Sequence, residues 1–168
     1  MKMKIRLFLV LFVVSMSTGW ALADENFESA KKFFNAEEYK KAVRLLKKVT
    51  KEETSNTEAW ILLGDSYGSL GKNKDAVKAY ENAIRNDPES EVAFFGLGVT
   101  CGRMRKHSIA IDAFKKVIEI NPNNANAHFE LGVSYDRTAS ISKAFEQYKI
   151  LKKLDANLAD KLYQIIFY

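Results

Sequence analysis

The cysteine and the histidines of this 168-residue chain, residue types that catalysis and zinc binding often use, are Cys101, His107 and His128. A single cysteine cannot form an intramolecular disulfide or a zinc or iron-sulfur site that needs several thiolates. Neither histidine has a metal-ligand partner at a suitable spacing or a nucleophile near it, whereas catalysis needs several groups that converge. Gly96 and Gly98 lie within an expected helix, so they do not form a phosphate-binding loop. The sequence therefore predicts no enzyme, no metal site and no cofactor.

The same three residues have structural explanations. Free cysteine is among the most buried residue types, so Cys101 is expected to be a buried, inert thiol. His107 falls in a polar turn between two expected helices. His128 occupies a position that holds Trp60 and Phe94 elsewhere in the chain. A structural role is therefore predicted for all three residues.

The composition favours helices and argues against nucleic-acid binding. Hydrophobic residues make up 47% and charged residues 28% of the chain, with only 2 Pro and 8 Gly, which predicts a soluble, all-α globular domain. The formal net charge of +5 falls to +2 without Lys2, Lys4 and Arg6. The basic stretch over residues 40–51 has glutamates close to both of its ends. This pattern indicates a solvated helix face and no nucleic-acid partner.

The first 23 residues have the layout of a secretory signal peptide. Basic residues precede an apolar run from Leu7 to Val14, and small residues lead to the triplet that ends at Ala23. Cleavage after Ala23 would produce an exported protein, periplasmic or secreted, without a membrane span. The alternative is a retained anchor, because the 17 residues from Leu7 to Ala23 carry no charge and reach the short limit for a membrane-spanning helix.

The rest of the chain repeats itself every 34 residues without a gap. Internal periods of this length are typical of stacked helical repeats. One column contains alanine in every unit, and others contain mainly small or mainly aromatic residues. These columns are Ala42, Ala76, Ala110, Ala144; Ala30, Gly64, Gly98, Gly132; and Leu46, Tyr80, Phe114, Tyr148. The period divides the chain into units over residues 24–56, 57–90, 91–124 and 125–158.

Each unit has the pattern of a helical hairpin. In the second unit, amphipathic stretches over residues 57–70 and 74–85 flank a short polar turn. Small residues such as Gly64 allow two antiparallel helices to approach closely. Pro88 and Pro122 cannot continue a helix, so each ends a hairpin. One hairpin cannot bury its apolar face alone, so the units are expected to stack.

The residues in these columns resemble the tetratricopeptide repeat (TPR) family. The second unit matches the family pattern almost completely and the third nearly as well, while the first and fourth depart at several columns. The matching residues of the second unit are Trp60, Leu63, Gly64, Tyr67, Ala76, Tyr80, Ala83 and Pro88. The resemblance implies a TPR domain over residues 24–168 that forms a right-handed α-solenoid of stacked helix-turn-helix hairpins. Residues 159–168 are expected to form a C-terminal capping helix over the open end of the stack.

The resemblance also implies a function, since TPR arrays commonly hold a peptide or a helix of a partner protein in a concave groove lined by the first helix of each hairpin. The groove residues carried over onto this chain are Phe27, Ile61, Asp65, Phe95, Val99, Arg103, Phe129, Val133, Arg137 and Tyr163. Most of them are apolar, so the expected partner segment is apolar too. Some family members bind a terminal carboxylate with lysine and asparagine at these positions. This chain has hydrophobic residues and an aspartate there, so that activity is not expected.

Two alternatives to groove binding are open at this stage. The apolar row could be core, buried between neighbouring hairpins or beneath the C-terminal tail. The tail over residues 159–168 could also dock on a second copy and produce a homo-oligomer. The function that the sequence favours is a non-catalytic protein-interaction adaptor, or scaffold, of the cell envelope.

Overall fold

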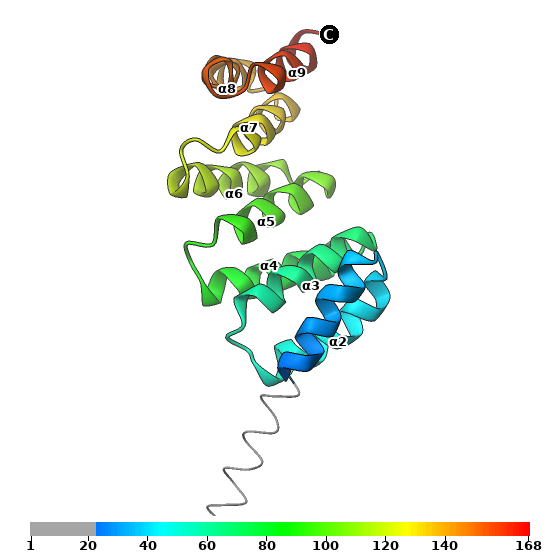
Figure 1. Cartoon of the computed structure of the whole chain (residues 1–168). Helices are drawn as coiled ribbons and strands as arrows, with labels where there is room; N and C mark the ends of the chain where they lie inside the picture. Colours follow the sequence, from blue (N-terminus) through cyan, green and yellow to red (C-terminus); the bar gives the residue numbers. More distant parts are fainter. Residues whose placement is uncertain (1–22) are drawn as a thin grey trace, which may run out of the picture.

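The computed structural model describes residues 23–168, and every regular element in this part of the chain is an α-helix (Figure 1). The helices are residues 23–35, α2 (Tyr39–Glu52), α3 (Thr57–Ser69), α4 (Asn73–Asn86), α5 (Glu91–Arg103), α6 (His107–Ile120), α7 (Ala125–Arg137), α8 (Ile141–Leu154) and α9 (Ala156–Phe167). The predicted all-α class is confirmed. The predicted signal peptide, residues 1–23, lies outside the described residues except for its last residue.

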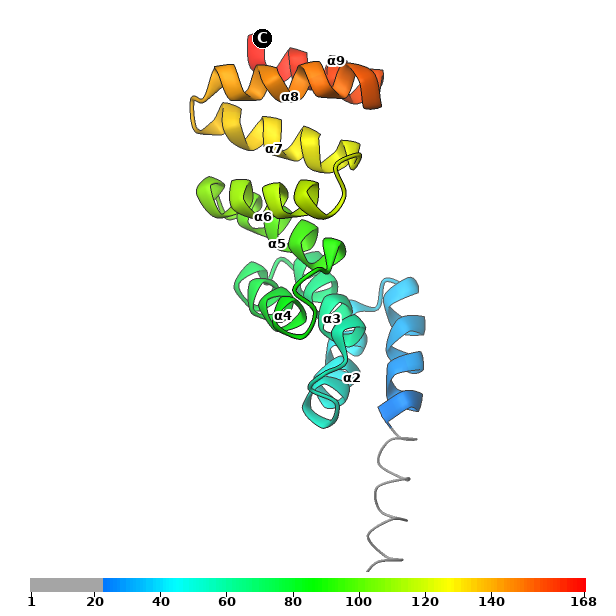
Figure 2. The same ribbon diagram turned by 90° about the vertical axis from the view of Figure 1, so that its left-hand side faces the viewer.

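The helices form antiparallel hairpins that stack in sequence order, as Figure 1 and Figure 2 show from two sides. Helix α3 pairs with α4, α5 with α6, and α7 with α8. The second helix of each hairpin also packs against the first helix of the next one, as α4 does against α5. The first helices of neighbouring hairpins touch one another as well, so that α3, α5, α7 and α9 form one continuous layer. The predicted α-solenoid is confirmed by this arrangement.

The turn inside each hairpin has the same backbone conformation, and it recurs with the 34-residue period. A residue with positive φ stands at Glu37, Gly71, Arg105 and Ala139. In each turn the next backbone N–H donates to a carbonyl five residues earlier, for example from Lys72 to the Tyr67 oxygen over 2.9 Å. These bonds are those of a Schellman motif, which satisfies the carbonyls that a helix end leaves free. Only the second unit has a glycine at the left-handed position.

The first helices of the second, third and fourth units begin at capping residues that are also 34 positions apart. The side chains of Asn56, Ser90 and Asn124 accept hydrogen bonds from the backbone N–H groups three residues later. Such caps satisfy N–H groups that have no partner within the helix. The cap positions therefore determine where α3, α5 and α7 start.

The core follows the repeat columns. The four alanines of the invariant column are fully buried, and Phe114 is buried against Gly98 on the facing helix. An added Cβ at Gly98 would lie 2.6 Å from the Phe114 ring, closer than packed atoms tolerate. The sequence-based role of small residues in these columns, close helix approach, agrees with this geometry.

The last helix differs from the sequence-based expectation because it starts at Ala156 and not at residue 159. The 34-residue period would place the cap at Leu158, which has no side-chain acceptor. Asp155 supplies the cap instead, accepting from the Leu158 backbone N–H over 3.0 Å. Ala156 also replaces the proline of the preceding units, so α9 follows α8 almost directly. Leu162 of α9 is fully buried beside Gly132 of α7, so α9 covers the end of the stack as expected of a cap.

Candidate functional site

A pocket of about 310 Å³ opens on the layer of first helices, between the helix over residues 23–35, α3 and α5. It is lined by Phe34, Asp65, Gly68, Ser69, Tyr80, Phe95, Gly96, Val99, Thr100 and Arg103. Four of the ten predicted groove residues are brought together here, namely Asp65, Phe95, Val99 and Arg103. The pocket therefore lies in the central part of the groove that the sequence predicted.

The floor of the pocket includes a side chain that comes from the second helix layer. Tyr80 starts on α4 and passes between α3 and α5, where Gly64 and Gly96 leave room for its ring. Its hydroxyl donates a hydrogen bond of 2.6 Å to the carboxylate of Asp65. Each glycine would clash with this ring if it carried a Cβ. The two glycines thus allow a polar contact to form on the groove side of the helix layer.

Two carboxylates on the first helices of the hairpins, one of them in the pocket, are disfavoured by burial in their charged form. Burial raises the pKa of Asp65, and the hydrogen bond from Tyr80 opposes part of that rise. Burial also raises the pKa of Glu130 on α7, and the nearby positive charge of Arg103 lowers it in part. Within the described residues, no Lys or Arg nitrogen forms a salt bridge with either carboxylate. The groove wall therefore offers hydrogen-bond acceptors beside its apolar side chains.

The aromatic wall of the pocket is held by the core beneath it. Phe95 packs edge-on against Phe114, with ring centroids 5.7 Å apart and an interplanar angle of 64°. Edge-to-face pairs of this kind stabilise ring positions beyond the effect of area alone. Phe95 is half-buried, so one side of its ring contacts the core and the other lines the pocket. Phe95 is thus both a core residue and a groove residue, although the sequence analysis treated these two roles as alternatives.

The other predicted groove residues are distributed differently. Phe27 is a correction: it is only 7% exposed and packs with Ala30 and Leu46 in the first core cluster, so its ring is not available to a partner. Ile61 is half-buried. The remaining four lie toward the C-terminal end; they are Phe129, Val133, Arg137 and Tyr163.

The C-terminal part of the predicted row is partly covered by α9. Phe129 and Val133 are half-buried and pack against the cluster that contains Leu162. Tyr163 on α9 is 37% exposed, and Arg137 is exposed as well. Helix α9 therefore covers part of the C-terminal end of the groove, and the groove stays open mainly in its central part, around α3 and α5.

Six of the ten residues that line the pocket were missed by the sequence reasoning, among them Phe34 and Tyr80. Glu130 on α7, whose pKa the charge of Arg103 lowers in part, was missed as well. Phe34 lies on the last turn of its helix and fills the N-terminal side of the pocket. Tyr80 belongs to the repeat column of mainly aromatic residues, and Gly96 close to Gly98 is the signal in the sequence that a side chain passes there. Glu130 gave no signal, because its burial depends on neighbours that are distant in sequence.

Cys101 and His128, two of the three residues with side chains suited to chemistry, are buried in the structure. Cys101 is buried with a free thiol, and burial raises its pKa, as expected of an inert cysteine. His128 is buried, with Nε2 2.9 Å from the Pro122 carbonyl oxygen and Nδ1 2.8 Å from the Gln147 side chain. His107 is the first residue of α6, one position beyond the expected turn. Among residues 23–168 no cluster of His, Cys, Asp or Glu could hold a metal ion.

None of the helices between residues 23 and 168 combines the length and the apolar character that crossing a bilayer requires.

The fold is similar to those of several solved proteins. The crystal structure of the MamA protein superimposes with a TM-score of 0.81 at 27% identity, covering 86% of this chain and 79% of that one. A MamA structure from Desulfovibrio magneticus RS-1, from residue 41 to its end, gives 0.77 at 18% identity, with 86% and 93% covered. YrrB, described as a TPR protein with an unusual peptide-binding site, gives 0.73 at 20% identity, with 83% and 75% covered. The TM-scores show that the fold is shared, and at identities this low the similarity extends to the fold alone.

The sequence comparisons identify the repeat itself. A comparison with curated proteins found no match. A family model described as tetratricopeptide repeat matches residues 33–97, and one described as TPR repeat matches residues 106–138. Together the two matches cover more than half of the chain, and the first includes all of α3 and α4. With the stacked hairpins and the recurring caps and turns, they establish that this chain belongs to the tetratricopeptide repeat family.

Proposed function

We propose that this protein is an exported, non-catalytic adaptor that holds an apolar peptide or helix of a partner protein in the groove between α3 and α5. TPR proteins bind protein or peptide partners, and this chain is a member of that family. The comparison with YrrB supports peptide binding by a related fold. The predicted signal peptide supports a location in the cell envelope or outside the cell.

The observation that carries the proposal is the pocket of about 310 Å³ with Phe34, Phe95 and Val99 on its walls. An apolar side chain of a partner would remove these three residues from water, which favours association. Asp65 and Arg103 lie on the same walls and would orient the partner by hydrogen bonds and charge more than they would strengthen binding. The groove thus combines an apolar anchor site with polar groups that fix direction.

The test uses two variants at one glycine. Gly68 lines the pocket, and an added Cβ there would meet only Arg103, at 4.0 Å. Gly68→Phe should fill the pocket, whereas Gly68→Ala adds a methyl group and leaves it open. Tagged wild-type and variant chains are used to capture partners from the envelope fraction, which are then identified by mass spectrometry.

We expect wild type and Gly68→Ala to retain the same partner and Gly68→Phe to lose it. Both variants should melt no lower than wild type, because both replace a helical glycine in open space. A partner retained equally by all three proteins would place binding outside this pocket and contradict the proposal.

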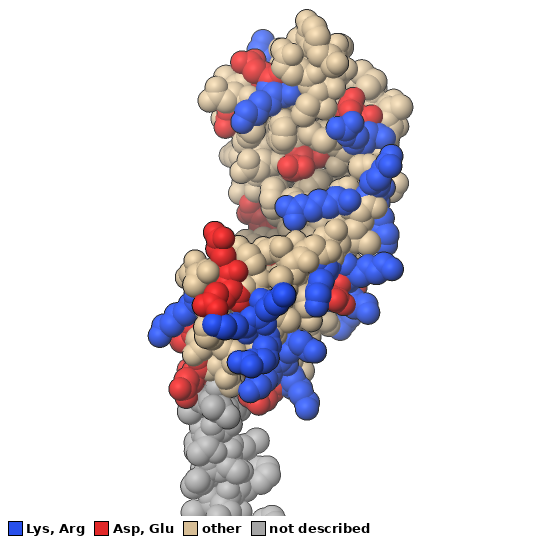
Figure 3. All heavy atoms as spheres, turned by 90° about the vertical axis from the view of Figure 1, so that its right-hand side faces the viewer, with Lys and Arg blue, Asp and Glu red and all other residues tan. Residues whose placement is uncertain are grey.

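A second candidate function, self-assembly through α9, has a separate observation in its favour. Most of the large exposed apolar side chains of the described residues lie on the last two helices or directly after them; they are Ile141, Ile150, Leu154, Tyr163, Ile165, Phe167 and Tyr168. Figure 3 shows one face on which charged side chains crowd the N-terminal hairpins and thin out toward this end. Apolar patches of this kind commonly mark interaction sites.

Phe167→Glu separates self-assembly from groove binding. Phe167 is 50% exposed, so the substitution should leave the fold intact. If copies associate through α9, the charge should convert oligomers to monomers in light scattering after gel filtration. Val92→Glu is the matched control, because Val92 is 61% exposed on α5 at a distance from the cap. An unchanged molar mass for Phe167→Glu would exclude self-assembly through this helix.

A further inference from the structure

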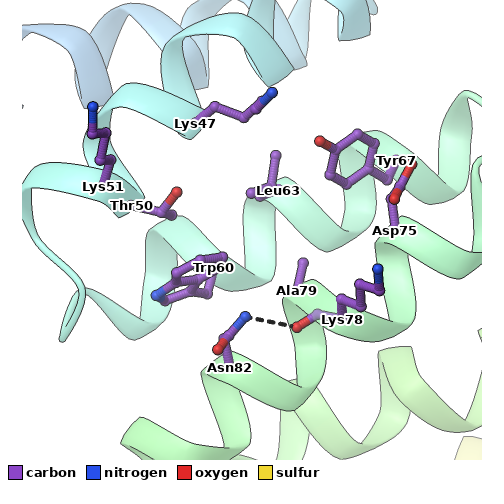
Figure 4. Close-up of a pocket in the computed structure, with 10 residues that line it drawn as sticks. All are labelled: Lys47, Thr50, Lys51, Trp60, Leu63, Tyr67, Asp75, Lys78, Ala79 and Asn82. Atoms are coloured by element: carbon purple, nitrogen blue, oxygen red, sulfur yellow. Dashed lines mark hydrogen bonds between the residues drawn. The ribbon is translucent and has the colours of Figure 1, made fainter.

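A second pocket, of about 350 Å³, lies on the other side of α3 (Figure 4). It is lined by Lys47, Thr50, Lys51, Trp60, Leu63, Tyr67, Asp75, Lys78, Ala79 and Asn82. Trp60, Leu63 and Tyr67 share one face of α3, while Asp65 and Ser69 of the groove share the opposite face, given 3.6 residues per turn. This pocket is therefore separate from the groove.

Apolar side chains from α3 and α4 form the floor of this pocket. The floor consists of Trp60, Leu63 and Tyr67 from α3 and of Ala79 from α4. The Trp60 indole is fixed, because its Nε1–H donates to the Thr54 carbonyl oxygen over 2.8 Å. A floor of two aromatic rings and a leucine suits an aromatic or bulky aliphatic side chain.

The rim of the pocket is basic. Lys47 and Lys51 are on α2 and Lys78 is on α4, and Asp75 is the one carboxylate among the lining residues. None of these three lysines forms a salt bridge with a carboxylate of residues 23–168. In Figure 4 the side chains of Lys47 and Lys78 extend toward Tyr67 from α2 and from α4. The rim can therefore pair with carboxylates of a ligand that enters the pocket.

The other junctions between hairpins show why the pocket opens here. The positions equivalent to Thr50 in the next two repeat units hold larger side chains, Ile84 and Ile118, and both are half-buried. Thr50 is short, and its hydroxyl turns back to donate to the Leu46 carbonyl oxygen over 2.9 Å. The same chain thus contains two versions of this junction with an isoleucine at the position that Thr50 holds here.

The charges of the rim also change from unit to unit. The column of Lys78 contains Asp112 and Glu146 in the following units, and the column of Lys47 contains Glu81 in the next one. The combination of a short residue at position 50 with three lysines around it therefore occurs at this junction alone among the described ones. A partner that needs both features would bind here and not one repeat further on.

We propose that this pocket is a second binding site, for a partner peptide that inserts one aromatic side chain between Trp60, Leu63 and Tyr67 and pairs flanking carboxylates with Lys47, Lys51 and Lys78. The apolar floor determines the central residue of the peptide. The three lysines determine the charge of its neighbours. Because the pocket and the groove use opposite faces of α3, the protein can hold two partner segments at once.

The probe is a dye-labelled peptide with a central phenylalanine between blocks of glutamate. Two further peptides test its features, one with alanine in place of phenylalanine and one with lysines in place of glutamates. Affinity is measured by fluorescence anisotropy, and the site by the NMR signal of the Trp60 Nε1–H, assigned with a Trp60→Phe variant. We expect saturable binding of the first peptide, at least tenfold weaker binding of the other two, and weakening by salt.

Two variants borrow residues that this chain already accepts at equivalent positions. Thr50→Ile should fill the pocket and weaken binding of the probe at least tenfold. The double variant Lys47→Glu with Lys78→Asp should do the same and abolish the salt dependence. The control is Lys115→Glu with Lys149→Glu, two exposed lysines in the Lys47 column of later units, which lowers the net charge equally.

The proposal is overturned if the Thr50→Ile variant, folded by circular dichroism, binds the probe as tightly as wild type. It is also overturned if the control double variant loses as much affinity as the Lys47→Glu, Lys78→Asp variant, because binding would then follow net charge. Absence of a saturable Trp60 shift up to millimolar probe would contradict it as well. Failure of the groove test at Gly68 would leave these outcomes unaffected, because that residue lines the other pocket.

Discussion

At the scale of single residues, the groove depends on a tyrosine that crosses a layer of helices. Tyr80 is buried, and its hydroxyl reaches Asp65 because Gly64 and Gly96 have no side chain in its path. The contact places an acceptor on the groove wall and gives the buried hydroxyl a partner. Neither residue looks unusual in the sequence, since the tyrosine column is part of the repeat.

Gly96→Ala tests this crossing. An added Cβ would lie 2.5 Å from the Tyr80 ring, and a buried ring between two helices cannot move away freely. We expect a loss of about 1–3 kcal/mol in the free energy of unfolding, measured with urea. Gly102→Ala is the control, because nothing lies within 4 Å of a Cβ there. That variant should gain about 0.5–1 kcal/mol from helix propensity, and a loss at Gly102 instead would contradict the explanation.

The carboxylate of Asp65 makes stability depend on pH. Because burial raises its pKa in the folded state, the folded chain binds more protons than the unfolded chain between the two pKa values. The contribution of Asp65 to the free energy of unfolding is therefore present at low pH. It is lost as the pH rises through the pKa that Asp65 has in the folded chain. Asp65→Asn should raise the melting temperature at pH 7 and flatten this part of the pH profile.

Asp112→Asn, at an exposed position, should change neither the melting temperature nor the profile to a comparable extent. An unchanged profile for Asp65→Asn would show that the buried carboxylate is not the source of the pH dependence.

Among the secondary-structure elements, the hairpin turns share one backbone conformation although their residue types differ. Four turns share one left-handed position, yet only Gly71 is a residue that adopts positive φ readily. Glu37, Arg105 and Ala139 adopt it because the Schellman hydrogen bonds of each turn require it. The sequence indicated the turns by their polarity, but it did not reveal this shared conformation.

The turns can be tested by exchanging residue types between them. Gly71→Ala should lower the free energy of unfolding by about 1 kcal/mol, since a Cβ is disfavoured at positive φ. Ala139→Gly should raise it by roughly 0.5–1 kcal/mol, because relief of that strain exceeds the entropy that glycine loses. Chemical denaturation of both variants beside wild type measures the difference. A change of the same sign in both would refute the role of positive φ.

At the scale of the whole molecule, α9 takes the place of the first helix of a fifth unit. It packs on α8 as α7 packs on α6, and it contacts α7 more extensively than α7 contacts α5; among the described residues no second helix completes that hairpin. In a stack of this kind each unit contacts its neighbours only, so an end unit is stabilised from one side. This geometry leaves Tyr163 and Phe167 at the surface while Leu162 is buried.

Leu162→Ala should therefore destabilise the last helices of the stack more than the others. Leu162 is fully buried, and its removal should lower the free energy of unfolding by about 2–5 kcal/mol. Hydrogen exchange should show faster exchange in α7, α8 and α9 and little change in α3 and α4. Equal acceleration in every helix would mean that the molecule unfolds as one unit.

The amino-acid sequence was enough to predict the helices, the 34-residue period, the stacking of hairpins and the family. These follow from local spacing, capping residues and helix-breaking residues, which act over a few positions and are visible in a single chain. Burial and side-chain contacts became known only from the packed helices, because they depend on residues that are distant in sequence. The tertiary structure alone showed that Phe27 is core, that Tyr80 reaches Asp65, and that Thr50 leaves a pocket where other units have isoleucine. The shift of α9 to Asp155 was decided locally, by the first residue able to cap it.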